Sequence, residues 1–162
     1  MSVVLARVDD RLIHGQVVVG WARYFEADCL VVANDAAAAD PMQRTLLPLA
    51  VPPHIVVGIY HVSEAAQQLQ AGLHAGKRII LLFATLADAL GYLQAGGELP
   101  ALNIGGVRFA PGKTQIKVAV ALGPEDLAAA RELDRRGVAL SMRMVPGEPE
   151  EPLIPALEAL KR

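Results

Sequence analysis

Short apolar runs rich in β-branched residues alternate along this chain with helix-length amphipathic segments. This alternation is typical of a parallel sheet whose strands are connected by helices packed on its faces. Most of the runs are apolar almost throughout, as strands covered on both faces should be. We therefore expect an α/β fold, a single-domain open and mostly parallel sheet of about six or seven strands with helices on both faces. The expected strands are residues 3–8, 29–33, 55–60, 79–83 and 102–105, with further β character at 115–121 and an outer strand at 139–145.

Capping signals place helices between these strands. Asp40 followed by Pro41 supplies an N-cap and a proline at the first helical position, which predicts a helix to about residue 49. Ser63 opens another helix, which Gly76 can end. Acidic residues in the first turn and arginines in the last predict a further helix over 124–136, because both ends complement the helix dipole.

One domain is expected to account for the whole chain, residues 1–162. At this length about 68–70% of the unfolded surface can be buried, so a real core is available. The chain is 53% hydrophobic but only 4% aromatic, which predicts a core of Val, Leu, Ile and Ala and excludes disorder as the main state. The proline-rich, acidic stretch 146–155 is expected as a turn before a short C-terminal helix at 156–161, not as a linker.

Charge and cysteine content exclude several function classes. A formal net charge of −2 offers no field to hold nucleic acid or an anionic membrane. Cys29 is the single cysteine, so neither an internal disulfide nor a cysteine metal cluster is expected. The longest uncharged apolar stretch, 79–87, is shorter than the ~18 residues of a spanning helix, and the first residues lack a signal-peptide core. We expect a cytoplasmic protein without a nucleic-acid partner, and any membrane role must go through another protein.

The turn after the first expected strand carries an unusual density of polar residues. In open parallel sheets, ligands bind outside the carboxyl ends of the strands, where the chain turns into the following helix. Here that turn contains His14 together with two arginines and two aspartates. The apolar residues Val17, Trp21 and Phe25 follow at i, i+4 and i+8, which starts a helix immediately after His14. The histidine is therefore expected at or near a helix N-terminus.

This placement favours nucleophilic chemistry. The positive end of the helix dipole disfavours an imidazolium, so a neutral imidazole can act as a nucleophile, and unpaired backbone N–H groups can bind a phosphoryl group. Gly15 lets the backbone approach that group, arginines offset its charge, and Asp10 or Asp9 can orient the imidazole. The constellation suits a covalent phosphohistidine. The catalytic candidates are His14, Arg11 and Asp10, and the phosphate-binding candidates are Arg7, Gly15 and Gln16.

The same residues also fit a purely structural interpretation. A histidine at a strand-to-helix turn is more often a capping or solvent-facing residue than a catalytic one. Asp9 and Asp10 are equally typical of turn and N-cap positions, and Arg7 and Arg11 of ordinary salt-bridge partners. The residue types alone leave both interpretations open.

A family resemblance favours the phosphohistidine. The unbroken run Asp9-Asp10-Arg11-Leu12-Ile13-His14-Gly15-Gln16-Val17 resembles the active-site signature of the IIB component of the mannose, fructose and sorbose branch of the bacterial phosphotransferase system (PTS). The likeness spans most of the chain and weakens after about residue 147. The other stretches that resemble the family, in the same order, are Asn34-Asp35, Leu81-Leu82-Phe83, Asn103-Ile104-Gly105-Gly106 and Gly112-Lys113-Thr114-Gln115.

The resemblance implies a mechanism and partners. The histidine that matches His14 receives a phosphoryl group, expected on Nδ1, from a phosphohistidine of a IIA component and passes it to a hydroxyl of a sugar held by the membrane components IIC and IID. No metal, nucleotide or other cofactor is required. A free-standing IIB is expected, cytoplasmic and peripheral to the inner membrane through IIC and IID. Which sugar it serves and whether it forms a homo-oligomer stay open. The alternative is a regulatory binding module of the same fold, whose phosphorylation state a partner reads without sugar transport.

Competing motifs are weaker. A phosphate-binding P-loop ending at Thr114 would need glycine where Val107 stands, so a hairpin or β-arch is expected there. A receiver domain would need an aspartate ending the third strand, but the first carboxylate there is Glu64. The remaining histidines have no metal-ligand spacing, and no metal site is expected; they are His54, His61 and His74.

Residues at the ends of two further strands are candidates for lining the same cleft. Asn34 and Asp35 end the second strand, and a simple turn pair is an equally good interpretation. Phe83 and Thr85 end the fourth strand, where the threonine is also suited to cap the next helix.

Overall fold

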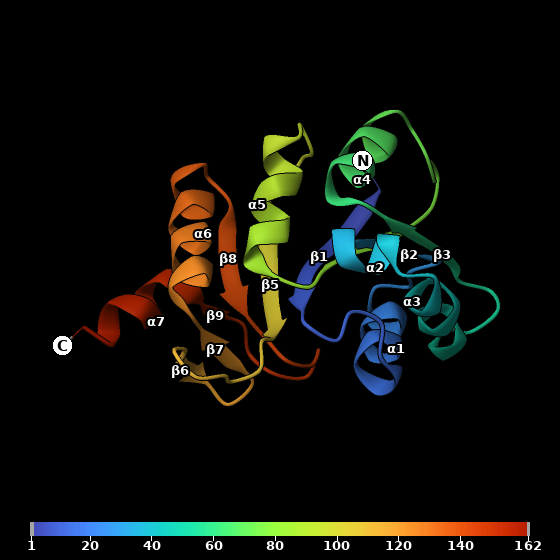
Figure 1. Ribbon diagram of the computed structural model, residues 1–162. Helices are drawn as coiled ribbons and strands as arrows, with labels where there is room; N and C mark the ends of the chain where they lie inside the picture. The colour runs from blue at the N-terminus through green and yellow to red at the C-terminus, as the bar shows by residue number, and fades with distance from the viewer. Residues whose placement is uncertain (1, 162) are drawn as a thin grey trace.

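The structure, a computed structural model, describes residues 2–161, apart from the side chains of Gln16, Val17 and Val19. Its centre is a seven-stranded sheet in the order β3-β2-β4-β1-β5-β8-β9 (Figure 1). All neighbouring pairs are parallel except β8 and β9, which confirms the expected α/β class. The strands are β1 (Val3–Asp9), β2 (Cys29–Ala33), β3 (Val56–Tyr60), β4 (Ile79–Phe83), β5 (Ala101–Gly106), β8 (Ala139–Met142) and β9 (Glu151–Pro152).

Helices cover both faces of this sheet. One core contains apolar side chains of α4, α5, α6 and α7, and Figure 1 shows α5 and α6 lying along the sheet side by side. The other core contains side chains of α1 and α2. Consecutive residues of the fully buried β4 divide between the two cores, which is why that strand is apolar at every position. The helices are α1 (Gly15–Tyr24), α2 (Asp35–Ala39), α3 (Pro41–Leu46), α4 (Val62–Gln70), α5 (Leu86–Gln94), α6 (Pro124–Arg135) and α7 (Leu153–Ala159), with a 3₁₀ helix at Leu47–Ala50.

Several expected boundaries shift. Asp40 caps α3 as expected, accepting the Met42 N–H at 2.9 Å, but the segment up to residue 50 continues as a 3₁₀ helix with Pro48 near its start. The helix expected from Ser63 to Gly76 is α4, which ends at Gln70, and Gly72 follows with φ +92°. The C-terminal helix, expected at 156–161, begins earlier as α7.

The β character expected at 115–121 is confirmed. It forms an antiparallel hairpin outside the main sheet, made of β6 (Thr114–Lys117) and β7 (Val120–Leu122). The segment expected as an outer strand is β8, which lies one position inside the edge because the two-residue β9 pairs beside it.

The topology places the end of β1 at the middle of the carboxyl edge of the sheet. Val8 of β1 pairs with Phe83 of β4 on one side and with Ile104 of β5 on the other. The loop that follows β1 therefore lies between the carboxyl ends of β4 and β5. Open parallel sheets bind ligands at such positions. Among helices in the described part of the chain, none has both the length and the apolarity to cross a membrane.

Candidate active site

The loop between β1 and α1 is held by its own buried side chains. The Leu12 N–H donates to the Asp9 carbonyl at 2.9 Å, which closes a tight turn. Leu12 has φ 58°, a left-handed conformation that costs a non-glycine residue about 1–3 kcal/mol. Leu12 and Ile13 are both buried in the core under α1, and this burial offsets the strain. The next residue, His14, is thereby fixed as the N-cap of α1 with extended φ −146° and ψ 141°.

The imidazole of His14 is oriented by a buried carboxylate. Its Nε2 lies 3.0 Å from Oδ2 of Asp9, whose side chain is 2% exposed. The other oxygen of Asp9 accepts the backbone N–H of Arg11 at 3.1 Å. A carboxylate can only accept, so in the neutral ring the proton resides on Nε2 and the lone pair on Nδ1. In this tautomer, Nδ1 is the ring nitrogen of His14 with a free lone pair.

Of the two aspartates considered as partners of the imidazole, Asp9 contacts His14, whereas the catalytic candidate Asp10 occupies a different environment. Oδ2 of Asp10 accepts the backbone N–H of Arg108 at 2.8 Å and lies 3.1 Å from its guanidinium Nε. The Asp10 N–H donates to the Gly106 carbonyl at 2.9 Å. Asp10 thus ties the histidine loop to the segment that follows β5.

Arg7 is buried, and its prediction as a phosphate-binding residue is corrected to a structural role. Its guanidinium donates to Oδ1 of Asn103, to the Arg143 carbonyl at 2.8 Å and to the Met144 carbonyl at 3.0 Å. It also lies 3.6 Å from Oδ2 of Asp9. Burial lowers its pKa to about 10, against the opposing effect of Asp9, so Arg7 is charged at neutral pH. Its Nη1 and Nη2 donors are engaged inside the protein and its Nε is buried without a hydrogen-bond partner among the described residues, so an incoming ligand cannot reach them.

The glycines after Asn103 make room for these buried charges. A Cβ on Gly105 would lie 1.9 Å from Cζ of Arg7, and a Cβ on Gly106 would lie 3.2 Å from Oδ2 of Asp9. Arg7 also stacks over the indole of Trp21, with Cζ 5.1 Å from the ring centroid. The packing thus requires small residues at both glycine positions.

Arg11 is the cation on the open side of the site. Its side chain is 52% exposed, and its Nε lies 3.7 Å from Oδ1 of Asp9. Gly15 begins α1 with open space where a side chain would project. Because α1 has no acidic residue in its first turn, its positive end is not neutralised there. Gln16 lies in that first turn, but its side chain is outside the described part of the structure.

Comparison with known proteins identifies the family. Residues 3–161 match the model of the PTS system sorbose subfamily IIB component. The chain belongs to this family. It is 38% identical over 149 residues to the sorbose-specific EIIB component of Klebsiella pneumoniae, covering 92% of this chain and 91% of the relative. It is 37% identical over 158 residues to the sorbose-specific EIIB component of Lacticaseibacillus casei, covering 98% and 96%.

A solved structure supports the same assignment. The crystal structure of the IIBSor domain of the sorbose permease from Klebsiella pneumoniae matches with a TM-score of 0.92 and 36% identity over 98% of each chain. The protein is therefore a IIB component with a sugar phosphotransferase role, working with PTS partner components in general. The alternative of a purely regulatory binding module is not favoured.

The polar residues at the ends of β2 and β4 act as helix caps in this IIB component. Oδ1 of Asn34 accepts the Ala37 N–H at 2.8 Å and caps α2, while its amide donates to Asp88 at 2.8 Å. Thr85 accepts the Asp88 N–H at 3.0 Å and caps α5. These contacts confirm the capping and turn interpretations of Asn34 and Thr85. Burial raises the pKa of Asp88, and hydrogen bonds from Asn34 and the backbone oppose the rise.

The two other cleft candidates are placed differently from expectation. Phe83 is fully buried and packs against Tyr92 with ring centroids 5.5 Å apart, so its prediction as a cleft residue was wrong. Asp35 is exposed, and its Oδ1 accepts the Val62 N–H at 2.9 Å. Asp35 therefore links α2 to the start of α4.

Part of the site went unrecognised in the sequence. Beyond β8, the backbone carbonyl of Met144 accepts from both Arg7 and the indole N–H of Trp21, the latter at 3.2 Å. The guanidinium of Arg143 lies over the same indole, 5.3 Å from its centroid. These contacts use backbone atoms or stacking, which leave no motif. Only the resemblance of Asn103 to the family pointed toward this side of the site.

Proposed function

We propose that His14 is the residue on which this IIB component carries the phosphoryl group. It accepts the group from a phosphohistidine of a IIA component and passes it to a sugar hydroxyl presented by membrane components IIC and IID. The observation that carries the proposal is the 3.0 Å contact between Nε2 of His14 and Asp9, which leaves Nδ1 as the nucleophile.

In the accepting step, the Nδ1 lone pair attacks the phosphorus, the N–P bond of the donor breaks, and a new N–P bond forms in line. The attacking ring gains positive charge as that bond forms. Asp9 stabilises this charge through Nε2–H, as the carboxylate does in a catalytic triad. In the second step, the oxygen of the sugar hydroxyl attacks the same phosphorus, the hydroxyl proton is released to solvent, and the N–P bond breaks so that His14 leaves as neutral imidazole with its lone pair back on Nδ1.

Arg11 and Arg7 have different roles in this proposal. Arg11 is half exposed beside Asp9, the partner of the imidazole, so its guanidinium can turn to the oxygens of the phosphoryl group and bind them as a bidentate fork. The backbone N–H groups of the first turn of α1, from Gly15 onward, complement the same negative charge. Arg7 stays buried and holds Asp9, so it supports the chemistry without touching the phosphoryl group.

The proposed role also implies where in the cell the protein acts. Transfer to a sugar during uptake requires that His14 reach the cytoplasmic side of the IIC and IID components. We place the protein in the cytoplasm, peripheral to the inner membrane through those components. The absence of an apolar spanning stretch in the sequence is compatible with this placement.

The test is the intact mass of the protein after incubation with phosphoenolpyruvate, the general phosphotransferase proteins and the cognate IIA. Wild type should gain one acid-labile phosphoryl group, and His14→Ala should gain none. His61→Ala is the matched control, because His61 is a half-exposed N-cap histidine of α4, and it should behave as wild type. Absence of the group from wild type, with IIA itself phosphorylated, would refute the proposal, as would its presence in His14→Ala. Nitrogen-15 NMR of the phosphorylated protein should place the group on Nδ1.

A further inference from the structure

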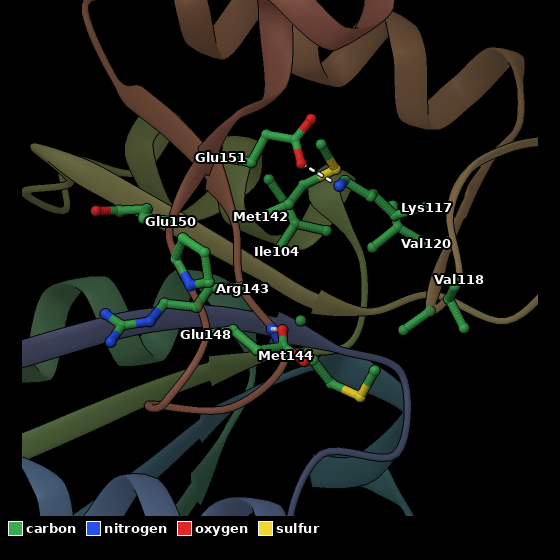
Figure 2. Close-up of a pocket in the computed structure, with 13 residues that line it drawn as sticks. Ile104, Lys117, Val118, Val120, Met142, Arg143, Met144, Glu148, Glu150 and Glu151 are labelled. Atoms are coloured by element: carbon green, nitrogen blue, oxygen red, sulfur yellow. Dashed lines mark hydrogen bonds and ion pairs between the residues drawn. The ribbon is translucent and has the colours of Figure 1, made fainter.

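A cavity of about 480 Å³ opens beside the candidate active site, between the ends of β5 and β8 and the β6–β7 hairpin (Figure 2). Its volume lies in the range of about 300–1,000 Å³ that is typical of ligand pockets. The floor is apolar and buried, formed by Ile104, Val120 and Met142. Val118 lines it from the hairpin loop and is 93% exposed. Val118 thus extends the apolar lining from the buried floor to the exposed mouth of the cavity.

The cavity shares the carboxyl edge of the sheet with His14. β1, which leads into the histidine loop, is next to β5, and β5 is next to β8. Gly105 lines the cavity on one side and accommodates the Arg7 guanidinium on the other. A protein–protein interface of ordinary size covers about 800 Å² on each partner. A protein seated over His14 therefore extends across this cavity.

The charged groups of the rim indicate the chemistry of the occupant. Glu148 and Glu150 are exposed carboxylates on the rim, while Lys117 is paired with Glu151. Figure 2 shows that ion pair on the side of the cavity away from Met144. Arg143 also lines the cavity, and its guanidinium stacks over Trp21 and Tyr24. The two cations and three carboxylates of the lining leave a net charge of −1. Such a rim complements an apolar side chain flanked by lysine or arginine.

One wall of the cavity is linked to the imidazole. Met144 lines the cavity, and its carbonyl accepts from Arg7 at 3.0 Å. Arg7 lies 3.6 Å from the Asp9 carboxylate, which lies 3.0 Å from Nε2 of His14. The cavity wall is thus joined to the imidazole by a chain of contacts, but none of the described residues that line the cavity is hydrogen-bonded to His14 itself. A lost anchor in the cavity is therefore expected to change KM for the donor and not kcat.

We propose that this cavity receives an apolar side chain, flanked by a basic residue, from the IIA phosphoryl donor as it docks over His14. The proposal rests on the proposed function of His14 as acceptor. The cavity is thus an anchor point of the donor interface, displaced from the reacting atoms along the edge of the sheet.

The test compares the kinetics of phosphoryl transfer from the phosphorylated cognate IIA to the wild type and to cavity variants. Val118→Asn removes the apolar lip at an exposed position, and Ala119→Phe fills the cavity. Each should raise KM for phosphorylated IIA about tenfold, the loss typical of a disrupted interface anchor, with kcat nearly unchanged. Glu150→Lys should raise KM at low salt and lose its effect at high salt. Leu49→Asn is the control, since Leu49 is 76% exposed on the 3₁₀ helix, outside the cavity and the site.

The measurements distinguish failure of the anchor from failure of the proposed function. Phosphorylation of the wild type by IIA establishes the underlying function, so a loss confined to the cavity variants supports the anchor. An unchanged KM in Val118→Asn and Ala119→Phe, with wild type active, overturns the anchor alone. Slower transfer only in the step to sugar, measured with vesicles containing IIC and IID, assigns the cavity to the membrane partner and also overturns the proposal. Failure of the wild type to accept a phosphoryl group overturns the proposed function together with the anchor.

Discussion

Replacing Asp9 with asparagine tests how the imidazole is prepared for attack. Asp9 accepts from Nε2 of His14 at 3.0 Å and from the Arg11 N–H at 3.1 Å, and its side chain is 2% exposed. Asparagine has nearly the same shape, so it can preserve the bond to the Arg11 N–H. Its NH₂ group then faces Nε2 and donates to it. The ring is thereby driven to the tautomer with its proton on Nδ1, which removes the nucleophilic lone pair.

The expected loss of rate in Asp9→Asn follows from the hydrogen bond between Asp9 and the His14 imidazole that the change removes. A hydrogen bond to a charged group contributes about 1.5–3 kcal/mol, which corresponds to a fall of about 10- to 150-fold in the rate of phosphoryl acceptance. The same change also removes the countercharge of Arg7, 3.6 Å away. Arg7 keeps its three other acceptors, so the loss of stability should stay below the about 3–5 kcal/mol of a fully broken buried pair.

The assay is rapid-quench phosphoryl transfer from phosphorylated IIA, at a temperature where circular dichroism shows each variant folded. Nitrogen-15 NMR of the imidazole reports the tautomer directly, which separates orientation of the ring from loss of stability. Asp10→Asn is the matched control, because Asp10 bonds Arg108 instead of His14, and its rate should fall far less. A rate for Asp9→Asn within twofold of wild type, or equal losses in both variants, would refute the reasoning.

Three further changes have distinct expected results. Arg11→Lys should slow phosphoryl transfer about tenfold or more with little change in Tm, since lysine lacks the bidentate fork. Arg7→Lys should instead mainly lower Tm. Equal transfer rates for both variants and wild type would contradict this expectation. Gly105→Ala places a Cβ 1.9 Å from Cζ of Arg7 and should cost about 1–3 kcal/mol in denaturant unfolding, while Gly147→Ala, with open space around it, should cost little. Arg135 and Arg136 lower the pKa of the Glu132 carboxyl from 4.5 to about 2. The stabilisation of the folded protein by these ion pairs is therefore present above pH 4.5 and lost as pH falls toward 2. The difference in Tm between wild type and Glu132→Gln should shrink over that window, and a constant difference would count against the ion pairs.

The sequence predicts the sheet better than its edges. β2 and β4 are apolar at every position because both faces are covered, so local pattern suffices to find them. β9 has two residues, and its position depends on pairing with Ser141 and Met142 of β8. No local pattern can specify such a short pairing. The same holds for the hairpin of β6 and β7, whose strands look like one β segment until the turn between them is known.

Within the site, local pattern predicted His14 at a helix start but left both Asp9 and Asp10 open as partners of its imidazole. Residues two apart in a strand share a face, and this alternation groups Arg7 with Asp9 and leaves Asp10 on the other side. Applied to β1, that rule selects Asp9 as the partner of a buried arginine. The burial of Arg7 itself depends on Asn103 and on carbonyls beyond β8, so two arginines that look equivalent in the sequence differ in exposure.

The bonds from Arg7 to the carbonyls beyond β8 join groups 136 and 137 residues apart in the chain. Synthesis proceeds from the N-terminus, so Asp9 and His14 leave the ribosome long before Arg143 and Met144. Until then the guanidinium lacks its final acceptors, and the carboxylate beside the histidine lacks a fixed neighbour. The acceptor site is therefore completed late in translation. An unfinished or C-terminally shortened chain, although it contains the entire signature around His14, should compete poorly with mature molecules for phosphoryl groups.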